Sequence, residues 1–285
     1  MQTSASTEKK TSDLQGAKLW IWLSIVAALL AIAGNIIALS IGSIYSRLTP
    51  VFLPQALAQD IADLSIVAPA WLILAILALR GSLRARLLWL GILSFTVYNY
   101  VIYTFSIPFG PLFLLWLAVF GLSLYALIGG VVSADHVAVR SAYTSERAVK
   151  AVAWSLMITG ILFALLWLSE DVPSLLAGKT PQSLLDMAIP TNPVHILDLS
   201  FFLPAVLITA VLLIRRRPLG YTLAPAFLVF LILTGIPILI TPVVQARRGE
   251  AAGWGVVPPI GTLTVILLCL LVWLISSVRT TKLTR

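Results

Sequence analysis

Eight long apolar stretches dominate this sequence and restrict what the chain can fold into. A helix crosses the hydrocarbon core of a membrane with about 20 mostly apolar residues. Only 11% of the 285 residues are charged and 60% are hydrophobic, which excludes a soluble domain, a disordered chain and a disulfide-rich secreted scaffold. The sequence therefore predicts an all-α, polytopic helix bundle in a lipid bilayer, with about eight transmembrane helices at residues 18–45, 60–80, 86–108, 109–133, 149–171, 194–214, 219–244 and 254–278.

The segments outside these stretches are short. Residues 1–17 are polar and predict a disordered tail, residues 134–148 predict a linker, and residues 279–285 predict a second tail. The apolar run that begins at Lys18 is too long for the core of a signal peptide, so we expect it to remain as the first spanning helix. The turn at 108–111, Pro-Phe-Gly-Pro, predicts a tight hairpin between the third and fourth spans.

The positive charges predict an orientation. With eight spans both chain ends share one side of the membrane, and that side holds fifteen of the 19 Lys and Arg residues, leaving Arg47, Lys179, Arg247 and Arg248 on the other. Because Lys and Arg accumulate in cytoplasmic loops, both termini and the two tails and linker are predicted to be cytoplasmic. The net charge of +8 then reflects topology, and the sequence predicts no nucleic-acid partner.

The acidic residues lie mostly on the opposite side or in the outer half of the bundle: Asp60, Asp63, Glu170, Asp171, Asp186, Asp198 and Glu250. Asp and Glu contribute little to orientation during insertion, so this asymmetry needs another explanation.

An internal similarity points to a duplicated chain. The segment 63–80, DLSIVAPAWLILAILALR, aligns without a gap on 198–215, DLSFFLPAVLITAVLLIR, and ten of the 18 positions are identical. The alternative is chance similarity between two apolar helices, but Asp, Ser, Pro and Arg also recur in register. A duplication would divide the chain into two parallel four-helix repeats, 18–133 and 149–278, as in the parallel-repeat class of transporters.

Polar side chains within the spans form the candidate ligand-binding site. Ionisable groups cost roughly 2.5–3.5 kcal/mol each at the centre of a spanning helix, so they usually face the bundle interior. At the repeat's shift of 135 residues Asp60 pairs with His195, and Asn35 pairs with Glu170. We predict an outer-half polar cavity formed by residues of both repeats: Asp63, Glu170, His195, Asp198, Asn35, Asn99 and Tyr103.

Two structural explanations compete with this site. Asn192 and Pro193 are typical of a helix N-cap and first helical position, which places His195 in a first turn near water. The polar groups could also serve hydrogen bonding between helices. A histidine and a carboxylate three residues apart make a weak metal signature, so no metal ligand is assigned, and the pattern indicates neither a cofactor nor an oligomeric state. The lone Cys269 is expected to be a small packing residue.

Prolines and glycines interrupt the last two spans. The segment 235–242 reads GIPILITP and the segment 253–261 reads GWGVVPPIG. Such residues break the helical hydrogen-bond ladder, which predicts either a gate or unwound ligand-binding stretch, or plain kinks.

Two stretches, TNPVHILDLS at 191–200 and RRRPLGY at 215–221, resemble segments of bacterial polytopic membrane proteins without an assigned activity. The resemblance implies a bacterial cytoplasmic (inner) membrane protein and brings no catalytic residue with it.

Three functions remain open at this point. The first is transport or binding of a small solute or cation through the outer-half cavity, motivated by the repeat and the acidic residues. The second is a membrane-embedded enzyme, with or without a metal ion, that uses Asp63, Glu170, His195 and Asp198. The third is an accessory subunit of a membrane complex. The sequence favours the first and leans against an enzyme.

Overall fold

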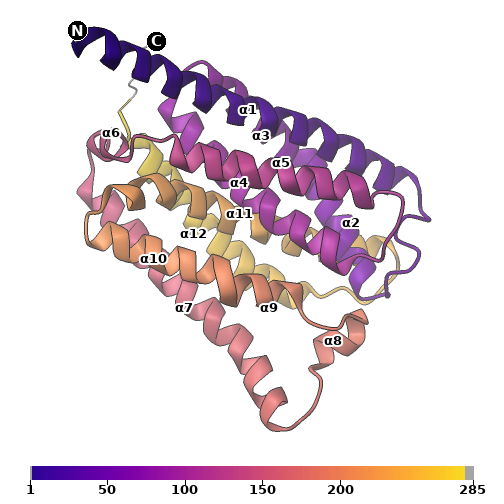
Figure 1. Ribbon diagram of the computed structural model, residues 1–285. Helices are drawn as coiled ribbons and strands as arrows, with labels where there is room; N and C mark the ends of the chain where they lie inside the picture. The colour runs from indigo at the N-terminus through magenta and orange to yellow at the C-terminus, as the bar shows by residue number, and fades with distance from the viewer. Residues whose placement is uncertain (1, 280–285) are drawn as a thin grey trace.

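In the part of the chain that the computed structural model describes, eight helices are long and apolar enough to span a membrane, which confirms the predicted number. The structure describes residues 2–279, which contain no β-strand and one isolated bridge between Tyr143 and Val278. The elements are α1 Gln2–Ser40, α2 Phe52–Ala62, η1 Asp63–Val67, α3 Ala68–Leu79, α4 Leu83–Ser106, α5 Phe113–Val132, α6 His136–Ser141, α7 Glu146–Leu176, α8 Gln182–Met187, α9 Pro193–Leu197, η2 Asp198–Phe202, α10 Leu203–Ile214, α11 Pro218–Arg247, η3 Trp254–Val256 and α12 Val257–Ser276 (Figure 1).

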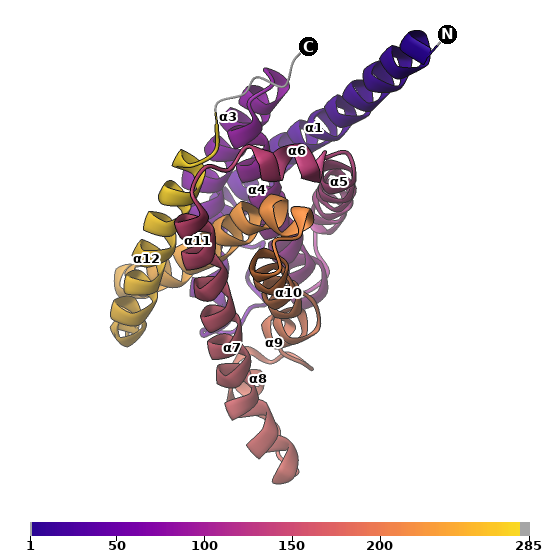
Figure 2. The same ribbon diagram turned by 90° about the vertical axis from the view of Figure 1, so that its left-hand side faces the viewer.

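The spans form two groups of four with the same neighbours in each. In the first group α1 packs against α3 and α5, and α4 packs against the same two helices. In the second group α7 packs against α10 and α12, and α11 packs against those two as well. Figures 1 and 2 show the first group lying along α1 and the second around α7 and α12. The duplication of the whole four-helix unit stays a prediction.

The two groups meet where α11 packs against α4 and α2. Gly91 of α4 permits this close approach, because a Cβ atom there would lie 2.4 Å from Cβ of Val229 and 2.8 Å from the carbonyl oxygen of Ala226, both on α11. A small residue lets two helix backbones approach closely in a membrane, where apolar burial alone does not drive association.

The second and sixth spans each contain a π-helical segment, and the two segments lie 135 residues apart. Each segment begins at an aspartate, Asp63 or Asp198. The backbone N–H five residues later, of Ala68 or Leu203 respectively, donates to the carbonyl of that aspartate. After one intervening residue, each segment is followed by a proline, Pro69 or Pro204. A proline has no N–H to donate and its ring clashes with the carbonyl four residues before it, so a local widening of the helix relieves the conflict.

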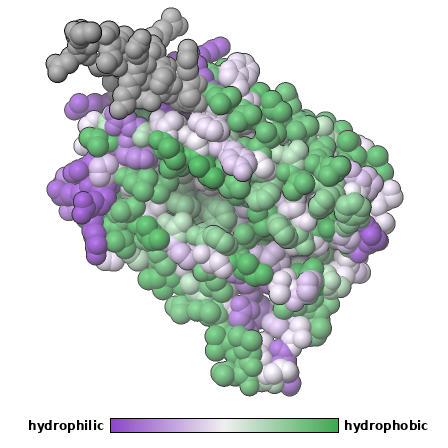
Figure 3. All heavy atoms as spheres, viewed as in Figure 1, coloured by the Kyte–Doolittle hydropathy of each residue, from purple (hydrophilic) through white to green (hydrophobic). Residues whose placement is uncertain are grey.

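Basic side chains and the chain ends share one end of the bundle. Arg84 donates to the carbonyl oxygens of Ser276 and Val278, and Arg216 forms an ion pair with Glu146 at 3.0 Å. The backbone N–H of Thr144 in the linker donates to the carbonyl of Ser277, which ties the linker to the end of α12. Figure 1 shows the two labelled termini at this end, and Figure 3, in the same view, shows hydrophilic residues along the upper left edge of the molecule.

The outer faces of α7 and α12 are apolar and exposed, as expected for surfaces that contact lipid. On α7, Ile158, Leu162 and Leu165 are 63%, 57% and 60% exposed. Cys269 lies exposed on α12, so the packing role predicted for it is wrong.

Several element boundaries differ from the predicted ones. Helix α1 begins at Gln2, where the sequence predicts a disordered tail, since an established span can be extended without the cost of nucleating a new helix. The second span begins at Phe52 instead of residue 60, because Pro54 is tolerated in a first helical turn. Asp60 is therefore two turns inside the helix and not at its start.

The seventh span is not unwound. Helix α11 runs without interruption through Pro225, Pro237 and Pro242, and α12 is continuous after the short η3 turn. The hydroxyl of Thr241 donates to the carbonyl of Pro237 at 2.8 Å, one turn earlier in the same helix. The predicted unwound stretch is thus wrong for α11, and the alternative of plain kinks stays a prediction.

Candidate functional site

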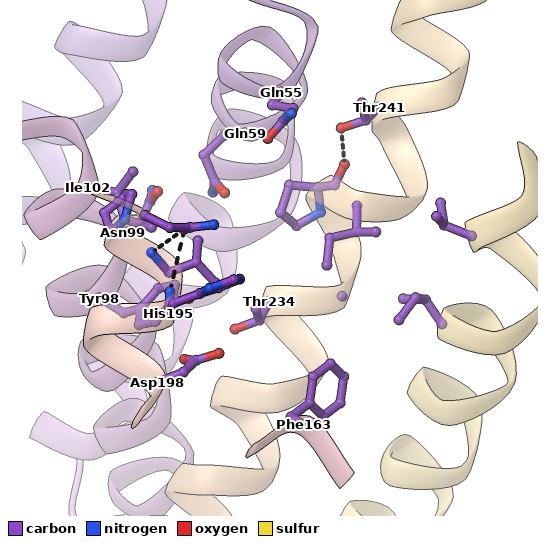
Figure 4. Close-up of a pocket in the computed structure, with 18 of the residues that line it drawn as sticks. Gln55, Gln59, Tyr98, Asn99, Ile102, Phe163, His195, Asp198, Thr234 and Thr241 are labelled. Carbon is purple, nitrogen blue, oxygen red and sulfur yellow. Dashed lines mark hydrogen bonds between the residues drawn. The ribbon is translucent and has the colours of Figure 1, made fainter. Parts of the chain in front are cut away.

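A cavity of about 600 Å³ lies between the two groups of spans. Its walls come from α2 and α4 on one side and from α7, α9, α11 and α12 on the other (Figure 4). Met187, Ile189 and Gly253, in the connections remote from the chain ends, also line it, so the cavity extends toward the end of the bundle opposite the basic residues.

The lining is mainly apolar and aromatic, with a few polar groups. Aromatic rings are supplied by Phe52, Tyr98, Tyr103, Phe163, Trp167 and Phe230. Amide and hydroxyl groups are supplied by Gln55, Gln59, Asn99, Asn192, Thr234, Thr241, Gln245 and Thr264. Asp198 supplies a carboxylate, and none of the lining residues that the structure describes is Lys or Arg. Pockets for small organic ligands have this composition.

Asp198 stands at the first residue of the π-helical segment η2 and is 8% exposed. Its Oδ2 accepts a hydrogen bond from Nε1 of Trp167 at 2.8 Å. Figure 4 shows Asp198 and Thr234 reaching into the space between η2 and α11 from its two sides. The bond to the neutral indole orients the carboxylate but does not compensate its charge.

His195 is held by two carboxylates and a ring. Its Nδ1 lies 2.9 Å from Oδ1 of Asp171, and its Nε2 lies 3.8 Å from Oε2 of Glu170. Because a carboxylate only accepts, Nδ1–H is the donor in the shorter contact. The imidazole also stacks on the indole of Trp167 with 4.6 Å between ring centres. The end of α7 therefore fixes the orientation of both His195 and, through Trp167, Asp198.

The predicted helix cap at the start of α9 is confirmed. Oδ1 of Asn192 accepts hydrogen bonds from the backbone N–H groups of Val194 and His195, at 3.0 and 3.4 Å, and Pro193 occupies the first helical position. The cap accounts for Asn192, whereas the side-chain contacts of His195 and Asp198 lie outside it.

Asp63 lies behind the cavity wall. Gln59 Nε2 donates to its Oδ1 at 2.9 Å and Asn99 Nδ2 donates to its Oδ2 at 2.7 Å. Both donors line the cavity, so Asp63 is one side chain away from it. The carboxylate of Asp63 thereby holds two of the polar groups of the wall in place.

Asp60 is completely buried beside this wall. It accepts hydrogen bonds from the hydroxyl of Tyr103 at 2.5 Å and from that of Tyr45 at 2.8 Å. Tyr45 belongs to the connection between α1 and α2, and burial, followed by the negative charge of Asp60, raises the pKa of its hydroxyl. Tyr45 therefore keeps its proton and remains a donor to the carboxylate.

The predicted site residues fall into three groups. His195, Asp198, Asn99 and Tyr103 line the cavity. Asp63 and Glu170 do not line it but contact residues that do. Asn35 is buried in α1 away from the lining, and its Nδ2 has no partner among the described residues.

Reasoning from sequence missed several residues at this site. Trp167 and Asp171 belong to α7 and contact side chains more than 20 residues later in the chain. The available signal was their position near Glu170, since Trp167 lies three residues before it and Asp171 one residue after it. Gln59 could have been found as the residue one helical turn before Asp63.

A metal site was the basis of the metal-assisted alternative. Among the side chains that the structure describes, no group of three or more His, Cys, Asp or Glu residues is arranged to hold a metal ion.

Compared with models of known protein families, with curated proteins and with solved structures, the chain matches none.

Proposed function

We propose that this membrane protein binds a small organic solute in the cavity between its two four-helix groups and transports it across the membrane. The observation that carries the proposal is the cavity itself. It lies on the contact between the groups, and residues of both line it: Gln59 and Asn99 from the first, Asp198 and Thr234 from the second. A site between two structural halves is where small relative movements change access to it.

The shared architecture of the two groups supports this mechanism. Each group has the same pattern of helix neighbours, and each has a π-helical segment that begins at Asp63 or Asp198. These are the features expected of a parallel repeat, in which two similar units rock against each other about a site between them. The sequence similarity between segments 63–80 and 198–215 agrees with that origin.

The charge distribution supports an orientation. The end of the bundle that carries Arg84, Arg216 and the two chain ends would face the cytoplasm of a bacterial cell, because Lys and Arg resist translocation. The cavity then opens toward the outer side of the cytoplasmic membrane, through the connections that contain Met187 and Gly253.

Cysteine accessibility tests the proposal. The sequence has one cysteine, so a Cys269→Ser chain is a cysteine-free background. On it, Thr234→Cys places a thiol in the cavity, and Leu228→Cys places one at a completely buried position of the same helix that does not line the cavity. A membrane-impermeant thiol reagent added from the outer side should modify residue 234 and leave residue 228 unmodified.

The outcomes are distinct. Modification at residue 234 from the outer side supports a water-filled cavity that opens outward. A thiol at residue 234 that reacts no faster than one at residue 228, from either side of the membrane, would contradict the proposal.

A further inference from the structure

We infer that the solute is an organic cation, an amine or quaternary ammonium group attached to an apolar body, and that Asp198 and the aromatic side chains around it recognise its charge. This inference rests on the proposed function and specifies the chemical class of the solute.

The charges of the cavity wall favour a bound cation over a bound anion. Among the described residues that line the cavity, Asp198 is the one carboxylate and none is Lys or Arg. His195, which could carry a positive charge, contacts the carboxylates of Asp171 and Glu170. These three side chains together therefore carry no net positive charge. An anionic solute would therefore meet uncompensated negative charge in a medium of low dielectric constant.

The carboxylate itself lacks a cationic partner. Among the described residues Asp198 takes part in no ion pair, and its bond from Trp167 comes from a neutral N–H group. A buried carboxylate without a cationic partner is costly in a membrane, and such residues are rare and mark substrate or ion pathways. A bound cation would supply the missing charge.

Aromatic rings line the cavity together with this carboxylate. Trp167 bonds to it directly, Phe163 lies 6.1 Å from Trp167 between ring centres, and Tyr98 lies 5.3 Å from Phe230. All four rings line the cavity. Faces of Trp, Tyr and Phe attract cations through the ring quadrupole, and aromatic cages recognise quaternary ammonium groups in this way.

The remainder of the cavity fits an apolar body. Helices α11 and α12 contribute aliphatic residues to the lining, including Ile238, Ile260 and Leu263. A volume of about 600 Å³ is within the range of cavities that hold ligands of drug size. A simple metal cation would not need such a space or such a lining.

Three probes of similar shape and different charge test the inference on the purified full-length protein in lipid nanodiscs. The probes are benzyltrimethylammonium, phenylacetamide and phenylacetate, and their binding is measured by quenching of tryptophan fluorescence and by calorimetry. Wild-type protein should bind benzyltrimethylammonium at least 10-fold more tightly than phenylacetamide and should not bind phenylacetate.

Two substitutions separate local from general charge effects. Asp198→Asn should weaken binding of benzyltrimethylammonium by about 10- to 100-fold and leave phenylacetamide binding unchanged. Asp186→Asn, which removes a carboxylate outside the cavity lining, should change neither. If Asp198→Asn does not fold, the wild-type preference for the cation over the amide still decides the question.

The results also separate this inference from the proposed function. Equal binding of the cation and the amide by wild-type protein would overturn the cation assignment and leave solute binding in place. Failure of all three probes to bind would overturn both.

Discussion

Replacing Gly91 by alanine tests the contact on which both groups of spans depend. An alanine Cβ would lie 2.4 Å from Cβ of Val229 and 2.8 Å from the carbonyl oxygen of Ala226, whereas ordinary contacts begin at 3.4 Å. The carbonyl belongs to the backbone of α11, so no side-chain rotation relieves the overlap and the two helices must separate by about 1 Å. Overpacking of this kind costs about 1–3 kcal/mol.

The matched control is Gly121→Ala on α5. A Cβ atom there meets nothing within 4 Å, so this variant reports only the gain of about 1 kcal/mol that alanine brings to a helix interior. The difference between the two variants isolates the packing cost at the contact between α4 and α11.

Thermal unfolding followed by size-exclusion chromatography measures the effect. The midpoint of Gly91→Ala should lie below that of Gly121→Ala by about 2–4 °C for each kcal/mol of packing cost. Equal midpoints would refute the close approach of α4 and α11, and with it the placement of the cavity walls.

Two further outcomes follow from the polar contacts. Asp60→Ala leaves the buried hydroxyls of Tyr45 and Tyr103 without their acceptor and should lower the free energy of unfolding by about 1–3 kcal/mol for each. Asp60→Asn keeps one acceptor oxygen and should lose less stability than Asp60→Ala. Chemical unfolding of both variants measures this difference, and an equal loss of stability would contradict the expectation. At the linker, burial lowers the pKa of His136 from 6.5, Arg86 lowers it further and Asp135 partly opposes this, so folding favours the neutral ring that contacts Thr222. The stability that His136 contributes is complete above pH 6.5 and is lost as the pH falls through the pKa of His136 in the folded protein. His136→Asn should flatten this dependence of stability on pH. The same pH profile in the variant and the wild-type protein would contradict this role of His136.

Much of the fold could be predicted because membrane spans are local features. The length of each apolar run is set by the thickness of the bilayer, so eight spans follow from counting, and the proline-rich turn at 108–111 fixes one hairpin. The cap at Asn192 was predictable for the same reason, since a cap involves only its own helix turn.

The candidate site depended on contacts that no local pattern contains. The partners Trp167 and Asp171 are on α7, and only the packing of α7 against α10 brings them to Asp198 and His195. The depth of Asp60 was also hidden, because the polar residues before it, Gln55 and Gln59, obscured the start of α2 at Phe52. Conversely, the prolines of α11 suggested a break that packing against the neighbouring helices prevents.

Uptake of benzyltrimethylammonium into proteoliposomes tests most directly whether the cavity serves transport. With an imposed membrane potential negative inside, wild-type protein should accumulate the cation in a saturable manner, and Asp198→Asn should accumulate no more than protein-free liposomes. The lipid-facing substitution Cys269→Ser serves as a control that retains wild-type uptake. Uptake by wild-type protein that does not exceed the level of protein-free liposomes would contradict transport of this cation through the cavity.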